Sequence, residues 1–234
     1  MVALTVDVDW APDWMVVRMA ATLEAHGVPA TWFCTHASPA LARLRERPDL
    51  FELGVHPNFL PGSTHGAAPA EVLDHVMAIV PEAVSARAHC FVHSSPLLVE
   101  LRRRTPVRID SSTFLPDVEG LEPVRHRTAA GEVVRIPATW CDDYEPERPR
   151  PDWRLERLLG RPGVAVAVFH PARVCLNIAT AADYARLKPL VGAGERLAEA
   201  DAEPLPGEGP GPAFARLVER LADTGAARRL RDLA

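Results

Sequence analysis

The chain has 234 residues, of which 47% are hydrophobic and 24% are charged, and its formal net charge at pH 7 is -5. This balance is typical of a globular enzyme domain and excludes an intrinsically disordered chain. A net negative charge disfavours a nucleic-acid partner, which requires a basic surface. Since no run of 18 apolar residues is present, the sequence predicts no membrane-spanning segment.

The beginning of the chain and its cysteines suggest a compartment. The first residues lack the basic stretch and the cleavage site of a signal peptide. Four cysteines show no Cys-x-x-Cys spacing, and each lies in or beside an apolar run: Cys34, Cys90, Cys141 and Cys175. Buried free thiols are the expected state, which favours a reducing compartment. We therefore predict a cytoplasmic protein.

Strand-like and helix-like segments alternate along most of the chain, which predicts a parallel α/β fold. Residues 2–8 form a β-rich apolar run, as a buried parallel strand requires. A helix is expected from Asp13, which can cap it, to Gly27, which can end it. Further strands are expected at 30–35, 51–55, 87–91, 107–112, 132–140 and 163–169. Further helices are expected at about 38–46, 70–80, 95–104 and 153–159.

The composition divides the chain into three parts. Residues 1–191 carry the alternating pattern and are predicted to form one α/β barrel domain. Residues 192–212 are rich in Gly, Pro and acidic side chains, so they are predicted to be a linker. Residues 213–234 are predicted to form an amphipathic helix that packs on the barrel or on a second subunit, with Phe214, Leu217, Val218 and Leu221 at helical spacing.

Three predicted strands end in side chains that bind metals or transfer protons. The first ends in Asp7 and Asp9, the third is followed by His56 and then His65, and the last is followed by His170. The carboxyl ends of barrel strands carry active sites. One aspartate and two histidines suffice to bind a catalytic divalent metal and leave a position for water. A second carboxylate and a further histidine can then act as base and acid.

Five segments in this order carry a family resemblance: TVDVD, GVHPNFLPGSTHG, RAHCF, IPATWCDD and VFHP. Over roughly residues 3–180 the chain resembles the polysaccharide deacetylases with a NodB homology domain, the carbohydrate esterase 4 group. The resemblance implies a distorted (β/α) barrel. It also implies the metal-dependent hydrolysis of an N- or O-acetyl group.

The resemblance further implies a role for each matching residue. Asp7 matches the catalytic base of the family, and Asp9 matches its metal-binding aspartate. His56 and His65 match the two metal-binding histidines. The implied metal is Zn²⁺, with Co²⁺, Ni²⁺ or Fe²⁺ as alternatives.

Two more residues match later motifs of the family. Arg87 matches an arginine that orients the base, and His170 matches a histidine that acts as general acid. After Arg87, the usual Pro-aromatic pair is replaced by residues 88–91, so the substrate groove is expected to differ from that of a chitin or peptidoglycan deacetylase.

The metal-binding motifs depart from the usual pattern. Val8 separates the two aspartates, and the two motif histidines are nine residues apart instead of four. The loop at 57–64 must therefore fold back to bring His65 to the site. His89 and His93 are the alternatives to His65 as the second histidine ligand.

Four residues beside the predicted strand ends are candidates for substrate binding: Trp10, Asn58, Trp140 and Asp142. The two tryptophans could stack on a sugar ring or belong to the core. Asp142 could contact substrate or cap a turn.

The sequence thus predicts a metal-dependent N-deacetylase that acts on an acetamido sugar or a related small molecule. The loop between the two motif histidines should narrow the groove, which disfavours a long polymer. Two alternatives are a cyclic-imide or other ring-opening amidohydrolase and a non-catalytic carbohydrate-binding barrel. An iron oxygenase with two histidines and one carboxylate is disfavoured, because nothing marks a 2-oxo-acid site. A homo-oligomer is compatible with the terminal helix.

Overall fold

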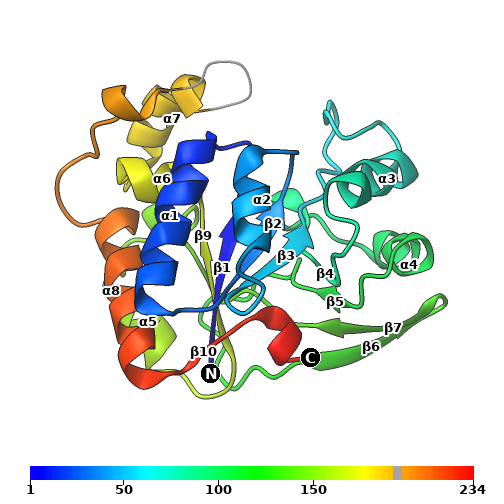
Figure 1. The fold of residues 1–234 in the computed structure, drawn as a ribbon. Coiled ribbons are helices and arrows are strands. Elements are labelled where there is room, and N and C mark those ends of the chain that lie inside the picture. Colours follow the sequence, from blue (N-terminus) through cyan, green and yellow to red (C-terminus); the bar gives the residue numbers. More distant parts are fainter. Residues whose placement is uncertain (192–196) are drawn as a thin grey trace.

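The computed structural model describes residues 1–191 and 197–234 (Figure 1). The strands are β1 (Val2–Asp7), β2 (Ala30–Cys34), β3 (Phe51–Val55), β4 (Ser85–Ala86), β5 (Ile109–Asp110), β6 (Val124–Thr128), β7 (Gly131–Arg135), β8 (Trp140–Cys141), β9 (Ala165–Phe169) and β10 (Ala227–Arg228). The helices are α1 (Asp13–His26), α2 (Pro39–Arg45), α3 (Pro69–Ile79), α4 (Ser95–Arg104), α5 (Glu156–Leu159), α6 (Pro171–Leu176), α7 (Ala181–Val191) and α8 (Pro210–Thr224).

A curled sheet organises the described residues, with the strand order β6-β7-β5-β4-β3-β2-β1-β9-β8. Neighbouring strands are parallel except in the β6–β7 hairpin, which is antiparallel. Helices pack on the outside of the sheet (Figure 1). This mixed α/β architecture with a curled, open barrel confirms the predicted fold class.

The most apolar segments form the centre of the fold. All six residues of β1 are buried, as the continuous apolar run predicts. Helix α1 buries the face that carries Met15, Met19 and Leu23. It ends at Gly27, whose φ of +63° is the left-handed conformation that glycine adopts at low cost. Asp13 does not cap this helix, because its carboxylate instead accepts a hydrogen bond from the Ser38 hydroxyl.

The predicted strand at 87–91 is wrong. Strand β4 ends at Ala86, and residues 89–91 form a 3-10 turn. Within that turn Cys90 and Phe91 have φ values of 53° and 54°. Left-handed residues cannot continue a strand, so the chain turns away from the sheet at this point.

Other elements also differ from the prediction. The predicted strand at 132–140 stops at Arg135, two residues before Pro137, which has no backbone N–H to donate to a neighbouring strand. The exposed strand β6 lacks an apolar alternation and was missed. Helices α6 and α7 were missed as well. Both are short or mostly exposed, which weakens the helical pattern of apolar residues.

The end of the chain closes the base of the barrel. Helix α8 buries Phe214, Leu217, Val218 and Leu221 against α1 and α6 of its own chain, as their spacing predicts. The helix ends before 225, and β10 then pairs with β1. Of the predicted linker at 192–212, residues 192–196 lie outside the described residues. The division of the chain into three parts stays a prediction.

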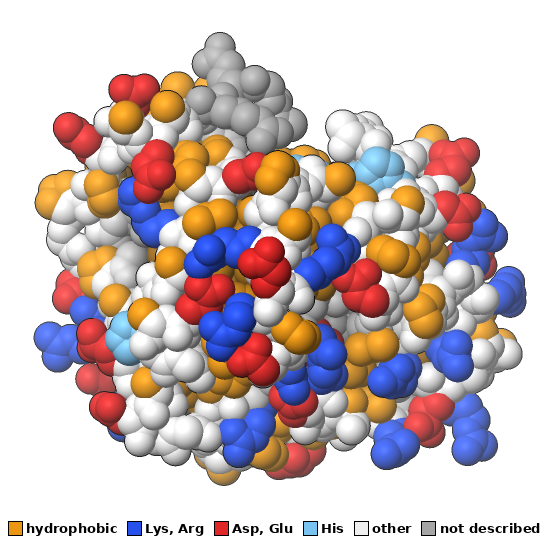
Figure 2. Space-filling model, in the orientation of Figure 1, with side chains coloured by type: hydrophobic (Ala, Val, Ile, Leu, Met, Phe, Trp, Pro, Cys, Tyr) orange, Lys and Arg blue, Asp and Glu red, His pale blue; other side chains and the backbone are white. Residues whose placement is uncertain are grey.

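The surface carries charges of both signs. On the face in Figure 2, acidic and basic side chains are interspersed among apolar and uncharged ones. Surface ion pairs in the described part of the chain include Arg43 with Glu24 and Arg45 with Glu82. This face therefore offers no uniformly basic surface of the kind that binds nucleic acids. Among the described residues, no helix is both long and apolar enough to cross a membrane.

Candidate active site

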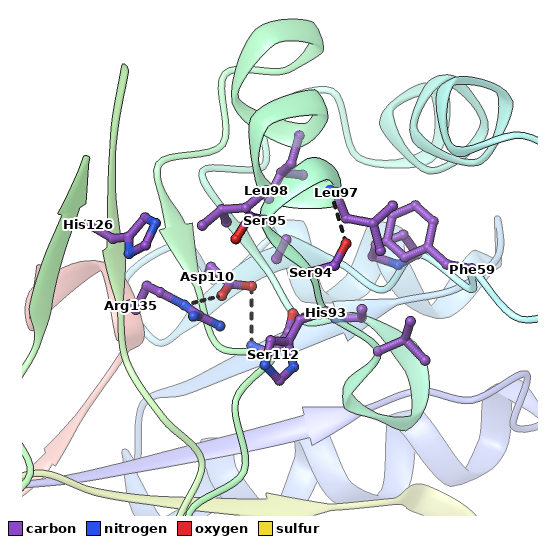
Figure 3. Close-up of a pocket in the computed structure, with 15 residues that line it drawn as sticks. Phe59, His93, Ser94, Ser95, Leu97, Leu98, Asp110, Ser112, His126 and Arg135 are labelled. Carbon is purple, nitrogen blue, oxygen red and sulfur yellow. Dashed lines mark hydrogen bonds and ion pairs between the residues drawn. The ribbon is translucent and has the colours of Figure 1, made fainter. Parts of the chain in front are cut away.

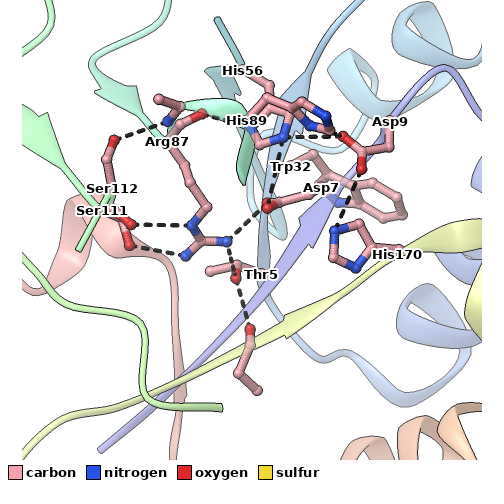
Figure 4. Close-up of polar contacts among 12 residues, drawn as sticks. Thr5, Asp7, Asp9, Trp32, His56, Arg87, His89, Ser111, Ser112 and His170 are labelled. Carbon is pink, nitrogen blue, oxygen red and sulfur yellow. Dashed lines mark hydrogen bonds and ion pairs between the residues drawn. The ribbon is translucent and has the colours of Figure 1, made fainter. Parts of the chain in front are cut away.

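The side chains that sequence analysis singled out gather where parallel strands end. Because the carboxyl ends of these strands meet at one end of the sheet, residues far apart in the chain become neighbours (Figure 4). Asp7 ends β1, and Asp9 follows it two residues later. Each of four further strands is followed directly by one of these residues: β3 by His56, β4 by Arg87, β8 by Asp142 and β9 by His170.

Asp9, His56 and His89 form a group suited to a metal ion. The Oδ1 atom of Asp9 lies 3.1 Å from Nε2 of His56 and 3.0 Å from Nδ1 of His89. One ligand atom from each residue lies within 4.8 Å of the other two. This is a donor set of two imidazole nitrogens and one carboxylate, which is typical of divalent transition metals.

The hydrogen bond on the far side of His56 fixes its tautomer. Nδ1 of His56 donates to the carbonyl oxygen of Arg87 at 2.6 Å. A neutral His56 therefore carries a lone pair on Nε2, and this buried atom has no hydrogen-bond partner among the described residues. Its lone pair faces a carboxylate oxygen of Asp9 at 3.1 Å, and two such acceptors are stable side by side when a metal cation or a proton lies between them. The residues present thus fit a divalent metal.

The negative charge of Asp9 favours a positive charge within the metal-binding group. Burial alone would raise the pKa of Asp9, but its close contacts with the imidazoles of His56 and His89 outweigh burial and hold the pKa well below its usual range. Burial would lower the pKa of His89, but the hydrogen bond with Asp9 outweighs it and raises the pKa to about 10. A metal that binds here must displace a proton from His89.

His65 does not join this group. The backbone N–H of Asn58 donates to Nδ1 of His65 at 3.1 Å, so the neutral ring carries its proton on Nε2. Burial and the nearby His75 lower the pKa of His65 to about 4, which keeps the ring neutral. Nε2 of His65 is buried and, like Nε2 of His56, has no hydrogen-bond partner among the described residues. The structure places His89 inside the group and His65 outside it, and the role of His65 as a metal ligand stays a prediction.

The remaining alternative ligand is also outside the group. Nδ1 of His93 lies 3.0 Å from the carbonyl oxygen of Phe91, and the residue lines a different cavity.

Arg87 is fully buried and holds Asp7. Its Nη1 donates to Asp7 Oδ1 at 2.8 Å and to the Thr5 hydroxyl at 2.7 Å. Its Nη2 donates to the Ser111 hydroxyl at 2.9 Å (Figure 4). The guanidinium lies over the ring of Phe33. The second oxygen of Asp7 is 3.8 Å from His56 Nε2. Asp7 is thus oriented beside the metal-binding group, as the predicted roles of Asp7 and Arg87 require.

His170 forms a dyad with Asp142. Its Nδ1 lies 2.5 Å from Asp142 Oδ1, and its backbone N–H donates to Oδ2 at 2.8 Å. Burial lowers the pKa of His170, but the negative charge of Asp142 outweighs burial and raises the pKa well above the usual value. Nε2 of His170 faces Asp9 Oδ2 at 3.6 Å. His170 therefore presents a protonated nitrogen to the site.

Three of the four candidate substrate contacts are engaged by the protein itself. Asp142 is fully buried, and both of its oxygens contact His170, so it positions that histidine. Trp140 is buried in the core against Trp153. The side chain of Asn58 accepts a hydrogen bond from the backbone of Leu60 and so stabilises its own loop.

Trp10 remains beside the site. Its ring lies 5.4 Å from the ring of His89 and 5.5 Å from that of His65, and it lines a cavity that adjoins the metal-binding group. Both Asp9 and Trp10 have positive φ values, 45° and 57°. Such strained residues cluster at functional sites.

A cavity of about 220 Å³ opens above the metal-binding group. One wall is aromatic: Phe91 stacks on Phe114 at 5.1 Å, and Phe114 meets the edge of Tyr144 at 5.0 Å. Sequence analysis missed these residues, because they come from loops without a recognisable pattern. Cys90 also lines this cavity and is exposed, so the prediction of buried thiols is wrong for Cys90 and holds for the other three.

The chain and its fold are similar to known deacetylases. The WbmS-like polysaccharide deacetylase family matches residues 4–188. The structure is similar to WbmS of Bordetella bronchiseptica, which is assigned as a polysaccharide deacetylase involved in O-antigen biosynthesis. The two chains are 30% identical with a TM-score of 0.75, and the match covers 94% of this chain and 90% of WbmS. A search of curated proteins found no match.

More distant structures share the fold alone. The Bc1960 peptidoglycan N-acetylglucosamine deacetylase is 12% identical with a TM-score of 0.51, over 99% of this chain and 86% of that one. A family 4 acetyl xylan esterase from Clostridium thermocellum, solved with a cobalt ion, is 14% identical with a TM-score of 0.50, over 99% of this chain and 89% of that one.

Proposed function

The chain belongs to the WbmS-like polysaccharide deacetylases, and on that premise we propose that it hydrolyses an acetamido group of a small sugar with a divalent metal at Asp9, His56 and His89. Membership confirms the family resemblance seen in the sequence. One observation carries the metal assignment: the buried Nε2 of His56 has no hydrogen-bond partner and faces a carboxylate oxygen of Asp9. Two histidines and a carboxylate favour Zn²⁺, and Co²⁺, Ni²⁺ and Fe²⁺ suit the same ligands.

The side chains around the group divide the work of amide hydrolysis. A divalent metal would act as a Lewis acid that polarises the acyl carbonyl and lowers the pKa of the attacking water. Asp7, held by Arg87, accepts a proton from that water. His170 donates the proton on Nε2 to the departing nitrogen, and Asp142 keeps that histidine protonated. The products are acetate and a free amine.

The size and wall of the cavity support a small substrate. A space of about 220 Å³ with an aromatic wall of Phe91, Phe114 and Tyr144 suits one sugar ring, because apolar sugar faces stack on aromatic rings. We propose an acetamido monosaccharide or a nucleotide-linked sugar as substrate. Three buried free thiols support the cytoplasm as the place of action.

The proposal is tested by measuring acetate release from acetamido monosaccharides. Chelation should abolish release, and Zn²⁺ should restore it. Asp7→Asn should keep the metal and lower turnover by about 100-fold, the usual scale for a lost general base. Asp9→Asn should lose the metal, whereas Asp49→Asn on the surface should change neither. Metal loss in Asp7→Asn with retention in Asp9→Asn would reverse the two roles, and ring opening of a cyclic imide without acetate release would refute the deacetylase assignment.

A further inference from the structure

Strands β4 and β5 separate two cavities. Side chains alternate between the two faces of a strand. Arg87 and Ser111, just beyond these strands, point toward Asp7 inside the barrel. Their neighbours line a second cavity on the opposite face: Ala86, Ala88, Asp110 and Ser112. Among the described residues, this second cavity shares no lining residue with the cavity at the metal-binding group.

The second cavity measures about 320 Å³ and has two unlike halves (Figure 3). Apolar side chains line one half, among them Phe59, Val92, Leu98 and Leu101. The β6–β7 hairpin supplies the polar half with His126 and Arg135, next to Asp110.

The polar half offers hydrogen-bond donors that the protein does not use. Arg135 donates from Nε to Asp110 at 3.0 Å and from Nη2 to Thr113 at 2.5 Å, whereas Nη1 has no partner in the described part of the chain. The ring of His126 likewise has no hydrogen bond to any described residue. Ser112 accepts from the backbone of Ala88, which leaves its hydroxyl proton free.

The carboxylate in the cavity is already engaged. Asp110 accepts from Arg135 at Oδ2 and from the backbone of Ser112 at Oδ1. Its negative charge is therefore matched by the guanidinium, and a ligand meets mainly unused N–H and O–H groups. Such a site complements an oxyanion, because charge-assisted hydrogen bonds from a guanidinium and an imidazole are stronger than neutral ones.

We propose that this cavity is a second binding site, for a small organic anion that places a carboxylate or phosphate at Arg135 and His126 and an apolar body against Phe59 and Leu98. The site is distinct from the reaction site, since strands β4 and β5 lie between the two. The inference does not depend on the proposed reaction. It rests on the apolar half of the cavity and on the unpaired hydrogen-bond donors of the polar half.

The test is a titration of the metal-loaded full chain with methyl groups of Leu and Val labelled for NMR. The probes are benzoate, phenyl phosphate and the neutral isostere benzamide. We expect benzoate or phenyl phosphate to shift the methyl signals of Val92, Leu98 and Leu101 saturably, with benzamide at least about tenfold weaker. The stronger anion identifies which oxyanion the site prefers.

Variants connect binding to the named side chains. His126→Phe should weaken the anion about tenfold, since it keeps an aromatic ring but removes the N–H that donates to the anion. His26→Phe, a matched change at an exposed position on α1, should leave affinity unchanged. Arg135→Lys, which keeps the charge next to Asp110 but lacks Nη1, should also weaken binding. Equal affinity for benzamide, shifts confined to the metal-binding group, or full affinity in His126→Phe and Arg135→Lys would overturn the proposal.

Discussion

Nδ1 of His56 donates a hydrogen bond to the carbonyl oxygen of Arg87 at 2.6 Å, and the side chain of the same Arg87 donates to Asp7 at 2.8 Å. One residue thus orients a proposed metal ligand through its backbone and the proposed base through its side chain. Because a substitution changes only the side chain, the two effects can be separated by mutation.

Arg87→Lys should lower turnover by about 100-fold while the metal content stays at the wild-type level. A lysine cannot reproduce the forked contacts with Asp7, Thr5 and Ser111, so the base loses its orientation. The measurement is kcat together with metal analysis of the purified variant. Arg43→Lys, which alters a surface ion pair, is the control and should change neither. Full turnover in Arg87→Lys would remove the positioning role.

Asp142→Asn should move the alkaline limb of the pH–rate profile to lower pH. A general acid works while protonated, so the rate falls as pH rises through its pKa. The charge of Asp142 raises the pKa of His170, and its removal lets that pKa fall. His170→Ala should abolish the limb altogether. An unshifted alkaline limb in Asp142→Asn would show that another group sets it.

Leu230→Ala should destabilise the fold by about 2–5 kcal/mol in urea unfolding, the range for a leucine removed from a packed core. Leu230 is fully buried in the closing segment after β10, and its backbone N–H donates to Thr31. The next residue, Arg231, donates its backbone N–H to the buried Glu52. The exposed Leu60→Ala should cost about 0.5 kcal/mol or less. An equal loss of unfolding free energy in both variants would show that the segment after β10 does not stabilise the fold.

The sequence predicted the residues that follow long buried strands. Asp7, Asp9, His56 and His170 were identified because an apolar run ends at each of them, and parallel strands bring such ends together. The same reasoning predicted the α/β fold and the buried face of α8. These features depend on local periodicity, which a single sequence displays.

Residues in turns were harder to place. His89 and His65 both lie outside strands; His89 contacts Asp9, whereas Nδ1 of His65 accepts a hydrogen bond from the backbone of Asn58. That bond depends on how the 57–64 loop folds, which the sequence does not show. Asp142 was recognised as a site residue, but its contact with His170 was not predicted, because this pairing joins residues that follow two separate strands.

Turnover should be higher on acetamido monosaccharides and nucleotide-linked sugars than on acetylated chito-oligomers. The cavity at the metal-binding group is small and walled by Phe91, Phe114 and Tyr144, so additional sugar units gain few contacts. The measurement is kcat/KM across a panel of increasing length. A steady rise with oligomer length would contradict this prediction and indicate a polysaccharide substrate.

Metal analysis of four proteins tests the central claim most directly: the wild type, His56→Ala, His89→Ala and His65→Ala. We expect about one divalent ion per chain in the wild type, a loss in His56→Ala and His89→Ala, and retention in His65→Ala, because His65 lies outside the group of Asp9, His56 and His89. Retention in His89→Ala together with loss in His65→Ala would contradict the assignment and make His65 the second histidine ligand. Equal occupancy in all four proteins would place the metal elsewhere.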